Sequence, residues 1–196
     1  MEILRLATPC RNVPVTFTLT MSHRRLHNLP LSRQMELSRQ YPWLKDVHTD
    51  DPRTDVKILS ISVFDHWLSR EDACRLLENV PPFEQARREA CHAQFCGLLV
   101  RGTSVLSFTF RRRRGDRLVF REFTSQAALS SYCTPNGARS FGGRGTRHFH
   151  VALPDLNCVF YEGWDDTHHF FFTDSTSMGP LHKWASQSGL YLLQNG

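Results

Sequence analysis

Three histidines and a tyrosine are spaced so that they could share one face of a β-sheet. His148 and His150 are two residues apart, and Tyr161 and His169 follow in the next two apolar runs. Because side chains alternate between the faces of a strand, His148 and His150 point the same way. Three imidazoles on one face can bind a divalent metal and leave a coordination position open, as catalytic zinc and non-haem iron sites do. One hypothesis is therefore a metal site of His148, His150 and His169 that could hold one divalent ion, Zn or Fe. The alternative is that this face is a polar, half-solvated sheet surface that happens to be rich in histidine.

Three short runs must position these residues, and they read as an antiparallel meander with turn-forming residues between them. The runs are 147–153, 157–162 and 168–173. The face with the histidines is expected to be polar and half-solvated. The opposite face is expected to be core, and its residues are Phe149, Val151, Leu153, Cys158, Phe160, Phe170 and Phe172.

The register of the meander decides which histidine reaches the site. The shortest loops set Glu162 opposite His168. Side chains directly opposite each other are neighbours on one face, so Tyr161 then lies between His150 and His169. A slip of one residue in either hairpin would put His168 in the place of His169.

Part of this stretch resembles the cupins. The resemblance depends on Gly142, on the His148-Phe149-His150 triplet and on Asp155, which stands where the family usually has Glu. A second, looser similarity runs through Gly179, His182 and Ser186, where the family has Asn. The resemblance covers about a quarter of the chain and implies a cupin-like β-barrel as the alternative fold. The segment 180–188, by contrast, reads better as a helix than as a barrel strand.

An arginine cluster forms the tip of a predicted hairpin between strands 105–110 and 118–123. Four successive arginines there could bind a phosphate backbone or the acidic surface of a protein partner. Phe108 and Phe110 alternate with polar residues and are expected to point into the core, not to stack on bases. A glycine-rich segment at 137–145 precedes the meander and is the natural lid for its site. The candidate binding residues are Arg111, Arg112, Arg113, Arg114, Arg144 and Tyr161.

A cysteine nucleophile is a further hypothesis. Cys133 could be served by His148 or His150 and oriented by Asp155, provided that the base lies within hydrogen-bonding reach of the sulfur. The alternative is that Cys133 is structural, as most isolated cysteines are.

Composition restricts the class of protein. The 196 residues include 40% hydrophobic and 22% charged residues, a balance typical of a folded globular protein. The net charge of +5 favours contact with phosphates, nucleic acid or an acidic protein partner. Charges or prolines interrupt every apolar stretch, so we expect no membrane span. The six cysteines form no CxxC pair or disulfide framework, which favours reduced thiols and a cytoplasmic location.

Two amphipathic helices are predicted in the middle of the chain. Ser69 and Asp72 form a capping box for a helix over 70–79. Pro82 opens a second helix over 83–95 that is expected to end at Gly97, before a short strand at 98–100. Within it, Glu84 and Arg88 are four residues apart and should pair on the exposed side.

Together these patterns predict a single α+β domain over residues 1–196. Its sheet is expected to be bent and mainly antiparallel, with helices packed on one face. We predict a small cytosolic binding protein that acts through a protein partner, of the toxin-neutralising or regulatory type. The alternatives are a metal-dependent enzyme with its site on the 147–173 meander, and a nucleic-acid binder that uses Arg111–Arg114.

Overall fold

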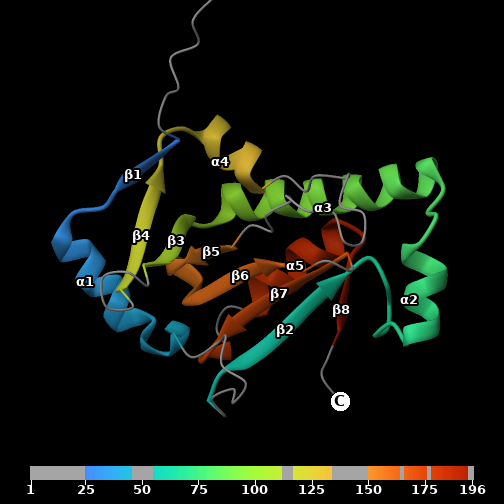
Figure 1. Ribbon diagram of the computed structural model, residues 1–196, viewed down its shortest axis with the longest axis horizontal. Helices are drawn as coiled ribbons and strands as arrows, with labels where there is room; N and C mark the ends of the chain where they lie inside the picture. The colour runs from blue at the N-terminus through green and yellow to red at the C-terminus, as the bar shows by residue number, and fades with distance from the viewer. Residues whose placement is uncertain are drawn as a thin grey trace, which may run out of the picture.

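The computed structural model describes residues 25–45, 55–111, 117–133, 150–163, 166–175 and 178–193, and Figure 1 shows how their elements are arranged. The strands are β1 (Leu26–Asn28), β2 (Lys57–Ser62), β3 (Leu106–Arg111), β4 (Arg117–Phe123), β5 (His150–Leu153), β6 (Cys158–Glu162), β7 (Thr167–Phe172) and β8 (Tyr191–Leu193). The α-helices are α1 (Leu31–Gln40), α2 (Arg70–Leu77), α3 (Pro82–Gly102), α4 (Gln126–Cys133) and α5 (Met178–Gln187). Two 3-10 turns, η1 (Pro42–Lys45) and η3 (Pro154–Leu156), complete the described elements.

These strands form one open antiparallel sheet in the order β1-β4-β3-β5-β6-β7-β2-β8. The fold is therefore α+β, as predicted. Hairpins join β3 to β4 and link β5, β6 and β7, whereas β2 enters from an earlier part of the chain and separates β7 from β8. The predicted register is confirmed in both meander hairpins: His150 pairs with Tyr161, and Glu162 pairs with His168.

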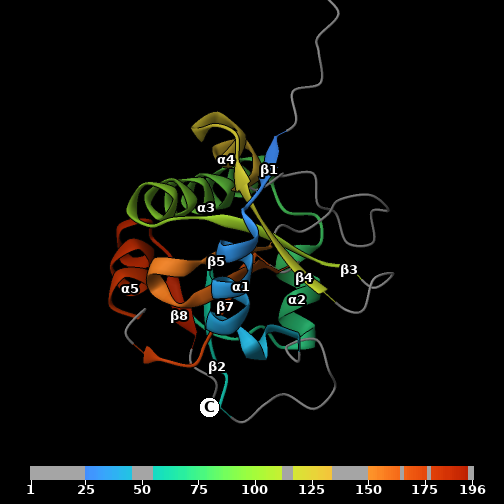
Figure 2. The same cartoon turned by 90° about the vertical axis from the view of Figure 1, so that its left-hand side faces the viewer.

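One face of the sheet, the first face, is covered by three helices. Phe160 and Phe170 point from this face towards Phe95 of α3, and α4 and α5 add Leu129 and Leu181 to the same core. Figure 2 shows α3 and α5 together on one side of the strands. The predicted apolar face of the meander is confirmed for the described residues, which are Val151, Leu153, Cys158, Phe160, Phe170 and Phe172.

The opposite face, the second face, carries a core of its own, so helices do not pack on one face alone. Leu37 of α1 and Trp43 of η1 lie buried with Phe108 and Phe120. The Gln34 side chain fixes α1 in place, because its amide donates to the Phe120 carbonyl at 2.6 Å and accepts from the Phe120 N–H at 2.9 Å. Large apolar side chains following α1 need burial, and the rings of β3 and β4 provide it.

Helix α3 is longer than the sequence predicts. It runs through Gly97 to Gly102, so the predicted strand at 98–100 is wrong. Phe95, Leu99 and Val100 lie on the side of the helix that packs into the first core, and continuing the helix keeps them there. Burial of this apolar stripe outweighs the roughly 1 kcal/mol cost of a glycine inside a helix. Among the described helices, none is both long and apolar enough to span a membrane.

Candidate functional site

The predicted site lies in a row of side chains that crosses the second face. Tyr161 of β6 stands between His150 of β5 and His169 of β7, as the register requires. Ser60 of β2 lies beyond His169. The row begins beside the second core, where the Phe108 ring lies 4.6 Å from the His150 ring. His150, Tyr161 and His169 are half-buried, and Ser60 at the β2 end is buried.

Both histidines in this row are engaged by neighbouring groups. Nε2 of His150 lies 2.8 Å from the Phe108 carbonyl oxygen. A carbonyl only accepts, so this nitrogen carries the proton and donates. Nδ1 of His169 lies 3.0 Å from the Ser60 hydroxyl. Tyr161 stacks on His150 with ring centroids 5.6 Å apart, and burial raises the pKa of its phenol.

The metal-binding hypothesis stays a prediction, because His148 lies outside the described residues. Within the part of the chain that the structure describes, no group of three or more His, Cys, Asp or Glu side chains could hold a metal ion. The hypothesis predicts a mass increase of one ion per chain in native mass spectrometry, removed by a chelator and absent in His150→Ala.

Beyond His169, the second face exposes a group of large apolar side chains. Trp67 stacks on the His169 ring at 6.4 Å with an interplanar angle of 8°, yet remains 42% exposed. Ile58 pairs with Phe171 of β7 and is 39% exposed. Tyr191 pairs with Ser62 at the β8 edge and is 50% exposed. Directly paired residues share a face of the sheet. We call Ile58, Trp67, His169 and Tyr191 the Trp67 face.

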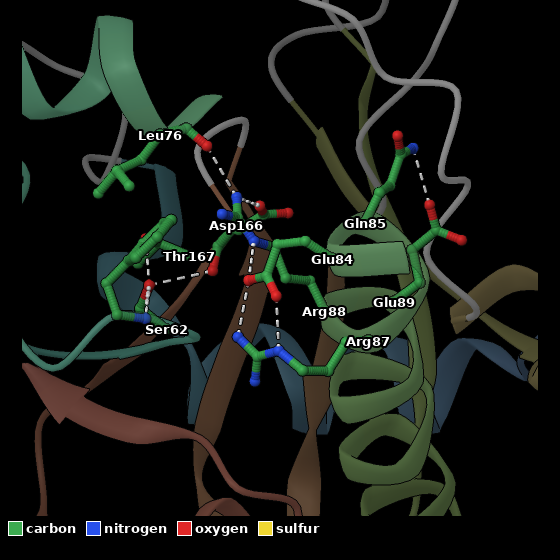
Figure 3. A network of polar contacts seen from close by, with 10 residues as sticks. Ser62, Leu76, Glu84, Gln85, Arg87, Arg88, Glu89, Asp166 and Thr167 are labelled. Carbon is green, nitrogen blue, oxygen red and sulfur yellow. Dashed lines mark hydrogen bonds and ion pairs between the residues drawn. The ribbon is translucent and has the colours of Figure 1, made fainter. Parts of the chain in front are cut away.

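A buried arginine on α3, Arg88, connects four segments (Figure 3). The Arg88 side chain is 7% exposed and bonds Glu84 at 2.9 Å and Asp166 at 3.2 Å. It also donates to the Leu76 carbonyl at 2.9 Å and lies 4.9 Å from the centre of the Phe64 ring. The predicted pair with Glu84 is therefore confirmed, but its expected exposed position is wrong for Arg88. This residue connects α3 to α2, to the β6–β7 turn and to the loop after β2.

One turn along α3, a second buried polar residue contacts the sheet. The His92 ring packs edge-on against the His168 ring of β7, with centroids 4.3 Å apart. His168 is enclosed further by Phe95 and Phe160, at 6.1 and 5.0 Å. Burial lowers the pKa of His92, and the nearby Arg88 charge adds to this effect, while Asp166 opposes it. His92 is therefore neutral at pH 7.

The sequence holds a signal for these residues that composition alone does not show. Arg88, His92, Phe95 and Leu99 follow one another at intervals of three or four along α3. That spacing places them on one stripe of a helix. Because the later members are apolar and buried, the earlier polar members are carried towards the sheet as well.

The remaining predicted residues are only partly described. Arg112, Arg113, Arg114, Arg144 and His148 lie outside the described residues, and Arg111 is described by its backbone alone, as the last residue of β3. The inward orientation predicted for Phe108 is confirmed, and Phe110 packs against the second core.

The cysteine hypothesis meets a geometric obstacle. Cys133 is buried in the first core, whereas His150 lies on the second face, so the sheet separates the thiol from this base. Burial raises the pKa of Cys133 to about 12, which keeps it a thiol at neutral pH. Asp155 bonds the Ser104 N–H at 2.7 Å at the end of α3.

Comparison of the chain with protein-family models, with curated proteins and with solved structures gave no match.

Proposed function

We propose that the protein is a small binding protein that acts through a protein partner, of the toxin-neutralising or regulatory type, and that the partner contacts the Trp67 face. One observation carries this proposal. Ile58 of β2 and Tyr191 of β8 are substantially exposed at positions whose strand pairing assigns them to the second face. The exposed Trp67, in the loop after β2, stacks on His169 of the neighbouring β7. Apolar side chains that cluster on a surface are typical of interaction sites, whereas isolated ones are common everywhere.

The residue types suit a protein interface. Tryptophan and tyrosine are enriched among the few residues that carry most of the binding energy. Stacking on His169 restrains the Trp67 ring before a partner arrives, so less side-chain entropy is lost on binding. The Ser60 hydroxyl lies 3.0 Å from Nδ1 of His169, and this contact connects the restrained ring to β2.

We also place the protein in the cytoplasm as part of this proposal. Supporting it, the five described cysteines are free: Cys74, Cys91, Cys96, Cys133 and Cys158. Free thiols are typical of a reducing compartment.

The test uses three single variants of the full chain with the same affinity tag. Trp67→Ser and Tyr191→Ser change the Trp67 face, and Phe83→Ser is the control, because Phe83 is 75% exposed at the start of α3. Proteins retained by the wild type and the control but lost by the first two variants are purified and titrated against the pure protein. A hot-spot residue contributes about 2 kcal/mol or more, so we expect each face variant to weaken binding roughly thirtyfold or more.

Two results would contradict the proposal. One is that no partner shows this selective loss. The other is that the purified complex forms equally well with Trp67→Ser and with Phe83→Ser. Thermal unfolding of each variant shows that any loss reflects the surface and not the fold.

A further inference from the structure

His92 is a titratable group inside an apolar contact. Its ring is 3% exposed, and within the described residues neither ring nitrogen has a partner at full hydrogen-bonding distance and angle. The Asp166 backbone is still close enough to raise the pKa of His92, which opposes the larger effect of burial. The His92 ring packs edge-on against His168, and the Phe95 ring stacks on His168 as well. A neutral imidazole fits such a site, whereas an imidazolium would lose its hydration there.

Charged groups around His92 come from each element that packs against it. Arg88 lies one turn earlier on α3 and repels a second positive charge. Asp166, in the β6–β7 turn, attracts it, but this carboxylate already pairs with Arg88. On the sheet, His168 of β7 faces the ring, and Glu162 of β6 is paired with His168. A proton on His92 therefore competes with Arg88 for the same carboxylate.

We propose that the contact of His92 with β7 is an acid-sensitive switch: when His92 is protonated, the N-terminal half of α3 separates from β7 and from the β6–β7 turn. The opening reaches the Trp67 face through Arg88. This residue packs on Phe64, three positions before Trp67, and bonds the Leu76 carbonyl of α2. When Arg88 leaves Asp166, the segment that carries Trp67 loses its attachment to α3.

The direction of the effect follows from proton linkage. The pKa of His92 in the folded chain lies below its ordinary value of 6.5. Below pH 6.5 the unfolded or opened chain binds a proton that the closed chain does not, so acid favours opening. The closed contact is fully stable above that value and weakens as the pH falls.

The test is hydrogen exchange of the free protein at pH 7.5 and 5.5, corrected for the intrinsic effect of pH on exchange. We expect peptides from 63–69, from 82–92 and from β7 to lose protection at pH 5.5, while α1 and β4 keep theirs. His92→Phe retains an aromatic ring without a titrating nitrogen and should abolish this difference. The control His182→Gln removes an exposed histidine of α5 and should leave it unchanged.

A second measurement keeps the proposal testable if His92→Phe does not fold. The midpoint temperature of thermal unfolding is measured for the wild type and for His92→Leu as the pH is lowered. For each pH unit below 6.5, the wild-type midpoint should fall by roughly 3–5 °C more than the midpoint of His92→Leu. Equal protection of the three segments at both pH values would overturn the proposal, and so would the same acid response in wild type and His92 variants. Hydrogen exchange is measured in the free protein, so its outcome does not depend on the proposed function. Only release of a protein partner in acid would depend on it.

Discussion

At the scale of single residues, Arg88 shows how burial changes the value of an ordinary ion pair. Two arginines of α3 bind the same carboxylate: Arg87 lies at 2.8 Å from Glu84 and Arg88 at 2.9 Å. Only Arg88 is buried, and only Arg88 reaches Asp166 and the Leu76 carbonyl. Exposed pairs contribute little to stability, whereas a buried charge that loses its partners is costly.

We predict that Arg88→Met lowers the free energy of unfolding by about 3 kcal/mol. The loss stands at the lower end of the range for a broken buried pair, because Glu84 and Asp166 both reach solvent and can be rehydrated. Arg87→Met is the matched control, with an expected loss below about 1 kcal/mol. Urea unfolding of both variants measures the difference. Equal losses of unfolding free energy would show that the contacts of Arg88 contribute no more to stability than the exposed pair of Arg87.

At the scale of elements, helix α3 contains two glycines, Gly97 and Gly102, whose surroundings differ. A Cβ on Gly102 would lie 2.2 Å from Cζ2 of Trp184, because the indole of α5 packs directly against the end of α3. A Cβ on Gly97 would meet only the guanidinium end of Arg101, at 3.4 Å. The first glycine permits a close approach of two helices, and the second has no comparable role.

Exchanging each glycine for alanine should therefore give opposite results. We expect Gly102→Ala to cost about 1–3 kcal/mol, because the indole must move within a packed interface. We expect Gly97→Ala to raise stability by up to about 1 kcal/mol, since alanine is the better helix former. Chemical unfolding of the two variants measures the signs; a stabilised Gly102→Ala would contradict the packing of α3 on α5.

Sequence patterns predicted the meander well and α3 only in part. Strand alternation and short loops fix the pairing of His150, Tyr161 and His169, because a slip would move every apolar side chain off the core. The predicted end of α3 at Gly97 was wrong. A glycine is a local signal for a helix end, and it does not show that the core will bury Leu99 further along the helix. The capping of α2 by Ser69 was predictable, because it depends on residues three apart: its hydroxyl accepts from the Asp72 N–H at 3.0 Å.

At the scale of the whole molecule, the sheet separates two cores. The first holds α3, α4 and α5, and the second holds α1 and η1 at the β3–β4 half of the opposite face. The sequence predicted the second face as polar and half-solvated. Towards β3 and β4 this face is instead a buried core, and towards β2 it exposes apolar side chains beside the half-buried His169. The covering residues of α1 and η1 are far away in sequence, so local alternation could not reveal them. Among the described residues, the apolar side chains that stay exposed towards β2 are those of the Trp67 face.

Site-specific photocrosslinking in cells tests the central claim, that the Trp67 face meets a protein partner. A benzophenone amino acid replaces Trp67 in one variant and Phe83 in another, and both proteins are irradiated and compared. We predict a discrete protein adduct at position 67 that is absent at position 83, and that is lost when Tyr191→Ser is added. The same adducts at both positions, or none at position 67, would contradict the account.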